Sequence, residues 1–239
     1  MTRLMLQTMR WIYGWRWLVL PPTVGVLMLA MLVGAVVVAP REVVEGEVQR
    51  LMYIHVPSAI SGYFAFAVVF AASVGLLWTR DMRFDAVARG AATVGVLFTF
   101  MMLTTGAIWG KPIWGTYWAW DARITSTLIL FLLYTAYLLA RSLADELDEQ
   151  AARYSAVYAI VAFLDIPIIN MSVRWWRTLH PQPIVVEGAL PMGMQIVLGL
   201  SMLAIVLLTV WLIVLRAETE GIGARATALR AALDRREGE

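Results

Sequence analysis

Histidine is rare in this chain, and its two copies occur in similar surroundings. His55 lies two residues before Pro57, and His180 directly precedes Pro181. Proline biases the residue before it away from the helical region, so each imidazole is expected at a corner between two segments. Two neutral imidazoles can bind one metal ion from opposite sides, because histidine is the commonest metal ligand in proteins. The pair therefore predicts a metal or metal–macrocycle site.

An iron macrocycle fits such a pair better than zinc does. Haem iron can take one axial ligand on each face of the ring. Zinc prefers four ligands in a tetrahedral arrangement, and the chain has no cysteine to complete that set. The residues alone leave one alternative open, in which each histidine makes only an ordinary hydrogen bond at the membrane interface.

A tryptophan-rich segment, residues 109–123, adds a second feature. It is interrupted by Gly110, Pro112 and Gly115. Tryptophan favours the headgroup level of a membrane, so an aromatic belt is one interpretation. The concentration of aromatic residues in one segment favours a flat, apolar floor for a macrocycle. Its tryptophans are Trp109, Trp114, Trp118 and Trp120.

Charged residues in and near this segment are candidates for binding the edge of the ring. Haem carries two propionates, and arginine binds a carboxylate through two parallel hydrogen bonds. The candidates are Arg123, Lys111 and Arg50, in that order. Asp121 is expected to cap the following helix, with direct ligand contact as the alternative.

Asp165 lies inside an apolar stretch, close to Pro167. An acidic group at membrane depth is costly and usually faces protein or a water-filled cavity. We therefore expect Asp165 to orient a histidine or to pair with an inward-facing arginine.

Apolar helices must position these residues. The chain has 239 residues, is 61% hydrophobic and only 15% charged, whereas soluble domains are about a quarter charged. The sequence predicts an all-α integral membrane protein of six transmembrane helices in residues 1–215, with a soluble helical tail over 216–239. The predicted transmembrane helices cover residues 18–38, 59–78, 90–108, 124–140, 154–171 and 194–215.

The candidate site falls in the connecting segments 39–58, 109–123 and 172–193. Short amphipathic helices are expected in the first and third of them, on the membrane surface. The residues expected on one helical face are Val44, Val48, Leu51 and His55 in the first, and Val173, Trp176 and His180 in the third.

The distribution of Lys and Arg predicts the orientation. The chain has 19 such residues, and most of them lie on the side that carries the termini. The positive-inside bias therefore puts both termini in the cytoplasm and both histidines on the outer, periplasmic face of a bacterial inner membrane. The residues on the outward side are Arg41, Arg50, Lys111, Arg123, Arg174 and Arg177.

Two function classes are disfavoured by composition and motifs. The net charge of +2 is too small to argue for nucleic-acid binding. The sequence has no G-x-x-x-x-G-K-[ST] phosphate loop. We therefore expect a protein that is not an enzyme, with ATP hydrolysis, where it is needed, supplied by a partner.

The stretch from Trp109 to Ser126 resembles the tryptophan-rich WWD family of membrane haem-handling proteins. Among the members of that family, the chain resembles the haem exporter protein C family of the cytochrome c maturation system, and the segments Tyr53–Pro57 and Ser172–His180 carry this likeness. The resemblance covers nearly the whole chain apart from its ends. The resemblance implies a non-covalently held b-type haem, with the two histidines as axial ligands and the tryptophans as its platform. Tyr117 stands where relatives often carry another tryptophan.

The resemblance also implies partners. These are a haem chaperone, an ATPase subunit, a second membrane subunit and a small single-span protein. The chain would hold haem and present it to the chaperone. The alternative is a permease subunit of an ABC-type exporter that moves haem or another substrate. An electron carrier like cytochrome b is disfavoured, because such carriers usually place paired histidines within helices and both histidines here are expected in loops.

Overall fold

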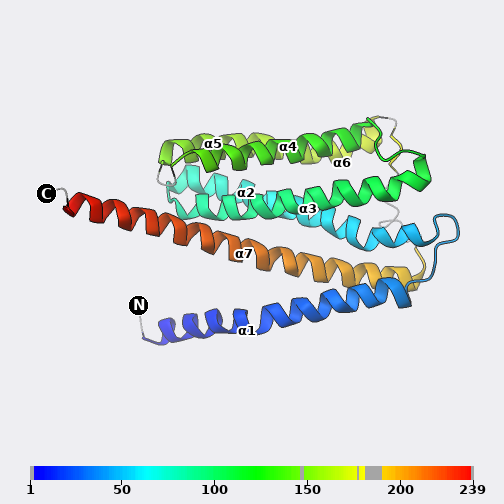
Figure 1. Ribbon diagram of the computed structural model, residues 1–239, viewed down its shortest axis with the longest axis horizontal. Coiled ribbons are helices and arrows are strands. Elements are labelled where there is room, and N and C mark those ends of the chain that lie inside the picture. The colour runs from blue at the N-terminus through cyan, green and yellow to red at the C-terminus, as the bar shows by residue number, and fades with distance from the viewer. Residues whose placement is uncertain (1–2, 146–147, 177, 181–189, 238–239) are drawn as a thin grey trace.

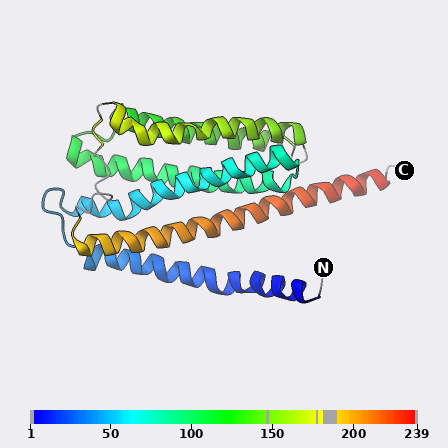
Figure 2. The same cartoon turned by 180° about the vertical axis from the view of Figure 1, so that it is seen from behind.

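The protein is a bundle of long helices that run roughly along one axis (Figures 1 and 2). The computed structural model describes residues 3–145, 148–176, 178–180 and 190–237. In chain order, the elements are α1 (Arg3–Val33), the π-helical turn η1 (Gly34–Val38), the 3₁₀ turn η2 (Glu47–Leu51), α2 (Met52–Thr79), α3 (Arg83–Trp114), α4 (Ala122–Leu143), α5 (Glu149–Phe163), α6 (Asp165–Trp175) and α7 (Met192–Glu237).

Within the described ranges, 6 helical spans are long and apolar enough to cross a bilayer. Helices α5 and α6 form one of them, interrupted at Leu164. The prediction of an all-α protein with six transmembrane helices is confirmed, and the chain is a multi-pass membrane protein. Helix α2 begins at Met52 rather than at residue 59, and α3 continues to Trp114. The apolar stretches underestimate these helices, because hydropathy marks only the part inside the bilayer core.

Helices α2 and α3 pack closely at the centre of the bundle. A Cβ atom at Gly95 would lie 2.5 Å from the Phe66 ring, and one at Gly62 would lie 3.0 Å from the Thr99 hydroxyl. Phe66 also stacks on Tyr134 of α4, with 3.8 Å between the ring centroids. Small residues let helices approach each other in a membrane, where association depends on packing. This contact holds together the helix ends that carry the candidate site.

The two ends of the bundle hold different connections between the helices (Figure 1). The α1–α2, α3–α4 and α6–α7 connections lie at one end, which we call the histidine end because it holds residues 39–55, 115–121 and 178–180. The α2–α3 and α4–α5 connections lie at the other, together with the N-terminal end of α1 and the C-terminal end of α7. We call it the arginine end, because Arg89 and Arg141 are buried there.

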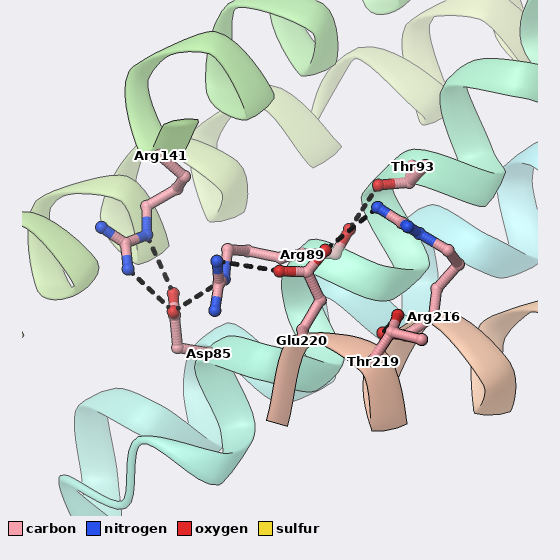
Figure 3. A network of polar contacts seen from close by, with 7 residues as sticks. All are labelled: Asp85, Arg89, Thr93, Arg141, Arg216, Thr219 and Glu220. Carbon is pink, nitrogen blue, oxygen red and sulfur yellow. Dashed lines mark hydrogen bonds and ion pairs between the residues drawn. The ribbon is translucent and has the colours of Figure 1, made fainter. Parts of the chain in front are cut away.

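A buried ion network joins α3, α4 and α7 at the arginine end (Figure 3). Arg141 donates two hydrogen bonds to the Asp85 carboxylate, at 2.9 and 3.2 Å. Arg89 lies 3.2 Å from the same carboxylate and 2.9 Å from a carboxylate oxygen of Glu220. A buried charge is tolerated only when it is paired, so these residues depend on one another. The network fixes α7 against the rest of the bundle.

The predicted tail, residues 216–239, is the continuation of α7 as far as Glu237. Its first turns are packed against α3, since a Cβ atom at Gly90 would lie 2.6 Å from the backbone nitrogen of Ala217. Farther along, Ile222, Leu229 and Leu233 are exposed. The first part of the tail therefore belongs to the bundle.

The α1–α2 connection differs from the expected amphipathic helix. Gly46 has a φ of 66° and donates its N–H to the Glu42 carbonyl at 3.2 Å, which closes a turn. Val44 is exposed, and the 3₁₀ turn covers only Glu47–Leu51. The glycine interrupts the helix, because its positive φ is incompatible with helix continuation. His55 therefore lies in the first turns of α2 rather than at the end of a surface helix.

The predicted surface helix over residues 172–183 is also replaced. Residues 172–175 are the last part of α6, which ends at Trp176 with φ −126° and ψ 159°. Residues 178–180 are not helical, and residues 177 and 181–183 lie outside the described residues. His180 is therefore held by a non-helical segment.

Candidate functional site

His55 lies against one face of α3. Its Nδ1 is 3.1 Å from the Thr105 hydroxyl oxygen. Its ring meets the Trp109 ring edge to face, with 5.7 Å between the centroids. A Cβ atom at residue 106 would lie 2.9 Å from Cε1 of His55, so this close approach requires Gly106. Thr105, Gly106 and Trp109 share a helical face and together fix the orientation of the imidazole.

Trp109 links α3 to the α1–α2 connection. Its indole Nε1 donates a hydrogen bond to the Glu45 carboxylate at 2.9 Å. Glu45 lies in the turn closed by Gly46. Trp109, which packs beside His55, is therefore held both by α3 and by the α1–α2 connection. Neither Glu45 nor Thr105 could be recognised as a contact of this site from local sequence patterns.

The tryptophan-rich segment is partly helical rather than one loop. Helix α3 includes Trp109 and Trp114, and it ends where Gly115 adopts a φ of 74°. A Cβ atom at Gly110 would lie 2.7 Å from the Trp114 ring, so that ring covers the backbone of α3. Pro112 is accommodated near the helix end, in the last turn. The expectation of a loop over 109–123 was therefore wrong for its first half.

Trp118 and Trp120 lie in the remaining loop, between α3 and α4. Their rings meet edge to face, with 5.5 Å between the centroids. Trp120 is 77% exposed. The Trp118 Nε1 is buried without a hydrogen-bond partner among the described residues. A buried N–H group without a partner is costly, so this position favours a bound group that accepts its hydrogen bond.

Asp121 caps α4, as predicted, and has a second role. Its Oδ1 accepts a hydrogen bond from the Ile124 N–H at 2.8 Å. Its Oδ2 accepts from the Thr178 hydroxyl at 2.7 Å and from the Leu179 N–H at 3.2 Å. The His180 N–H donates to the Thr178 hydroxyl at 3.1 Å. One carboxylate thus attaches the segment that carries His180 to the start of α4.

The two histidines come together at the histidine end with one arginine. His55 interacts electrostatically with His180 and with Arg123. Arg123 also interacts with the side chain of Tyr63 on α2. Both imidazoles are half-buried. The structure therefore brings together residues 125 positions apart in sequence, together with the first of the predicted cations.

The other two predicted cations are engaged elsewhere. Arg50 pairs with Glu47 at 2.5 Å and donates to the backbone carbonyls of Ala35 and Ala39, at the end of η1. Lys111 donates to the Gly115 carbonyl at 2.8 Å. Its Nζ also lies over the Tyr117 ring, 5.2 Å from the centroid. Among the three candidates, only Arg123 interacts with His55.

Asp165 lies in the first turn of α6, next to the break at Leu164. Its Oδ2 is buried, and within the described part of the chain no hydrogen bond is made to it. Asp165 interacts electrostatically with Tyr63. The expected contact with a histidine or an inward-facing arginine is not seen there.

These residues fit a haem group. The chain offers two imidazoles at one end of the bundle, a cation within electrostatic range of His55, and the buried Trp118 indole N–H, which has no partner among the described residues. Imidazole nitrogens bind haem iron, and an arginine pairs with a propionate. A zinc ion is less suited, because no group of three or more His, Cys, Asp or Glu side chains gathers in the described residues.

Comparison with known proteins identifies the family. The family described as Heme exporter protein C matches residues 4–232. Heme exporter protein C of Bradyrhizobium diazoefficiens is 40% identical over 181 residues, which cover 75% of this chain and 68% of that protein. The Escherichia coli K12 protein of the same name is 38% identical over 180 residues, covering 74% and 72%. The Haemophilus influenzae protein is 36% identical over 199 residues, covering 82% and 80%. The chain belongs to the Heme exporter protein C family.

Proposed function

We propose that the protein holds haem at the histidine end of the bundle, between His55 and His180, for use in cytochrome c maturation. The observation that carries the proposal is that the chain's two histidines lie at the same end of the bundle, within electrostatic range of each other. Family membership supports the choice of haem, since the relatives are named Heme exporter protein C. If haem is bound, the imidazole nitrogens of His55 and His180 would hold its iron.

The surrounding residues have distinct roles in this proposal. Trp109 orients His55 from α3. Trp118 offers its indole N–H to the bound group, and Trp114 and Trp120 complete the apolar platform. Arg123 neutralises a propionate through its guanidinium. The haem is of the b type, held by ligation and packing, since the chain contains no cysteine for a thioether bond.

The protein acts as a haem-presenting subunit and not as an enzyme. Because the proposed ligands lie in the first turn of a helix and in a non-helical segment, a haem held there would leave one edge of its ring accessible to a haem chaperone. An ATPase subunit, a second membrane subunit and a small single-span protein form the complex around it. The positive-inside bias places the arginine end in the cytoplasm and the histidine end on the periplasmic side of the inner membrane.

Absorption spectra of purified variants test the proposal. The unaltered protein is expected to show a Soret band, which His55→Ala and His180→Ala each weaken strongly. Arg83→Ala is the control, because its side chain is 86% exposed at the arginine end. An unchanged Soret band in either histidine variant would refute bis-histidine ligation. Uptake of labelled haem by vesicles carrying this chain alone would favour the permease alternative.

A further inference from the structure

The hydroxyl group of Thr105 makes hydrogen bonds in two directions. Its Oγ1 donates to the Met101 carbonyl at 2.6 Å, within α3. The same oxygen lies 3.1 Å from Nδ1 of His55. A threonine hydroxyl has one proton and two acceptor lone pairs. The shorter contact, to the carbonyl, engages the hydroxyl proton, which leaves the oxygen free to accept a hydrogen bond from His55.

This geometry determines which nitrogen of His55 carries the proton. A neutral imidazole has one N–H and one lone pair, and the tautomer follows from the partner of the N–H. With Thr105 as acceptor, the proton lies on Nδ1 and the lone pair on Nε2. Of the three ring atoms near Gly106, Nε2 is the farthest from the position of a Cβ atom there, at 3.9 Å.

We infer that Thr105 is a positioning residue, which fixes the Nδ1–H tautomer of His55 so that Nε2 is the iron ligand. The inference rests on the proposed function. Metal-binding histidines almost always donate their second ring N–H to a nearby acceptor, and this partner raises the basicity of the ligand. Thr105 provides such an acceptor here, beside the Met102 backbone carbonyl that also accepts a hydrogen bond from the His55 ring. The Met101 carbonyl holds the Thr105 hydroxyl in that role.

The inferred role differs from ordinary packing in its effect on the iron. Loss of the acceptor lowers electron donation from the imidazole, which destabilises the ferric state and raises the reduction potential. It also weakens the preference for the tautomer that leaves the lone pair on Nε2. A change in packing alone is not expected to raise the reduction potential of the haem.

The test compares four variants of the full-length protein purified with haem. Thr105→Val and Thr105→Ala both remove the hydrogen-bond acceptor. Alanine is the residue most favoured in helices, so Thr105→Ala removes the acceptor without weakening the helix. Thr105→Ser keeps the oxygen. Thr104→Val is the matched control, because the neighbouring Thr104 hydroxyl donates to carbonyls of its own helix, at 2.9 and 3.1 Å.

We expect Thr105→Val and Thr105→Ala to weaken haem binding by about 10–100-fold and to raise the reduction potential. Thr105→Ser and Thr104→Val are expected to behave like the unaltered protein. If haem affinity and reduction potential are unchanged in both Thr105→Val and Thr105→Ala, the inference is overturned. In that case, loss of the Soret band in His55→Ala would still support the proposed function. If His55→Ala retains the band, the proposed function itself fails.

Discussion

The carboxylate of Asp121 accepts a hydrogen bond from the Thr178 hydroxyl at 2.7 Å, although the two residues are 57 positions apart. Asp121 belongs to the tryptophan-rich segment, and Thr178 lies two residues before His180. The same carboxylate caps α4 through the Ile124 N–H. The contact therefore couples the position of one proposed ligand to the helix that carries Arg123.

The first prediction concerns this contact. Thr178→Val removes the hydrogen bond to Asp121 and the one that the hydroxyl accepts from the His180 N–H, and it leaves the cap of α4 intact. A hydrogen bond to a charged group is worth about 1.5–3 kcal/mol, and 1.4 kcal/mol corresponds to about tenfold in affinity. We expect haem affinity to fall about tenfold, as measured by spectroscopic titration. Thr135→Val is the matched control, since the exposed Thr135 hydroxyl bonds only to its own helix at Phe131. Equal affinities for the two variants would contradict the coupling.

The second prediction concerns the close approach of His55 to α3. Gly106→Ala places a methyl group 2.9 Å from Cε1 of His55, so the ring must move. Overpacking of this kind costs about 1–3 kcal/mol. We expect a lower haem content and a shifted Soret maximum. Gly199→Ala is the matched control, because a Cβ atom at Gly199 meets nothing within 4 Å. A Gly106→Ala protein with an unaltered spectrum would show that the ring is not confined there.

The third prediction separates stability from haem binding. Asp85→Asn leaves Arg141 and Arg89 without their shared carboxylate inside the bundle. Breaking a buried ion pair in this way costs about 3–5 kcal/mol, so the unfolding temperature in detergent should fall. Asp81→Asn is the control, because its ion-pair partner Arg83 has a side chain that is 86% exposed. The folded fraction of Asp85→Asn should keep its haem spectrum. Equal unfolding temperatures for both variants would contradict the role given to the network.

The fourth prediction tests the orientation. The chain has no cysteine, so a single introduced cysteine is a unique label site. Val43 is 95% exposed at the histidine end, and the Arg83 side chain is 86% exposed at the arginine end. In cells with a permeable outer membrane, a membrane-impermeant maleimide should label Val43→Cys and spare Arg83→Cys until the inner membrane is opened. The reverse pattern would place the histidines in the cytoplasm.

Sequence patterns predicted the features that depend on local physics. Six apolar spans follow from the length of hydrocarbon that a helix must cross, and this prediction is confirmed. The Asp121 cap follows from the preference for a carboxylate at a helix start, and it is confirmed as well.

Features that depend on contacts between distant segments could not be predicted from the sequence. Thr105 and Gly106 look like ordinary residues of an apolar helix, and their importance arises only because α2 brings His55 against them. Arg50 was a candidate for binding the edge of the ring, but it donates to the Ala35 carbonyl within η1 and to the Ala39 carbonyl directly after it. Only the tertiary structure decides which partner a long, flexible side chain reaches.

Low-temperature electron paramagnetic resonance of the purified ferric protein tests the central claim most directly. Ligation by His55 and His180 predicts a low-spin signal in the unaltered protein, and a high-spin signal or loss of haem in both His55→Ala and His180→Ala. A high-spin signal in the unaltered protein, or a low-spin signal that survives either substitution, would contradict it.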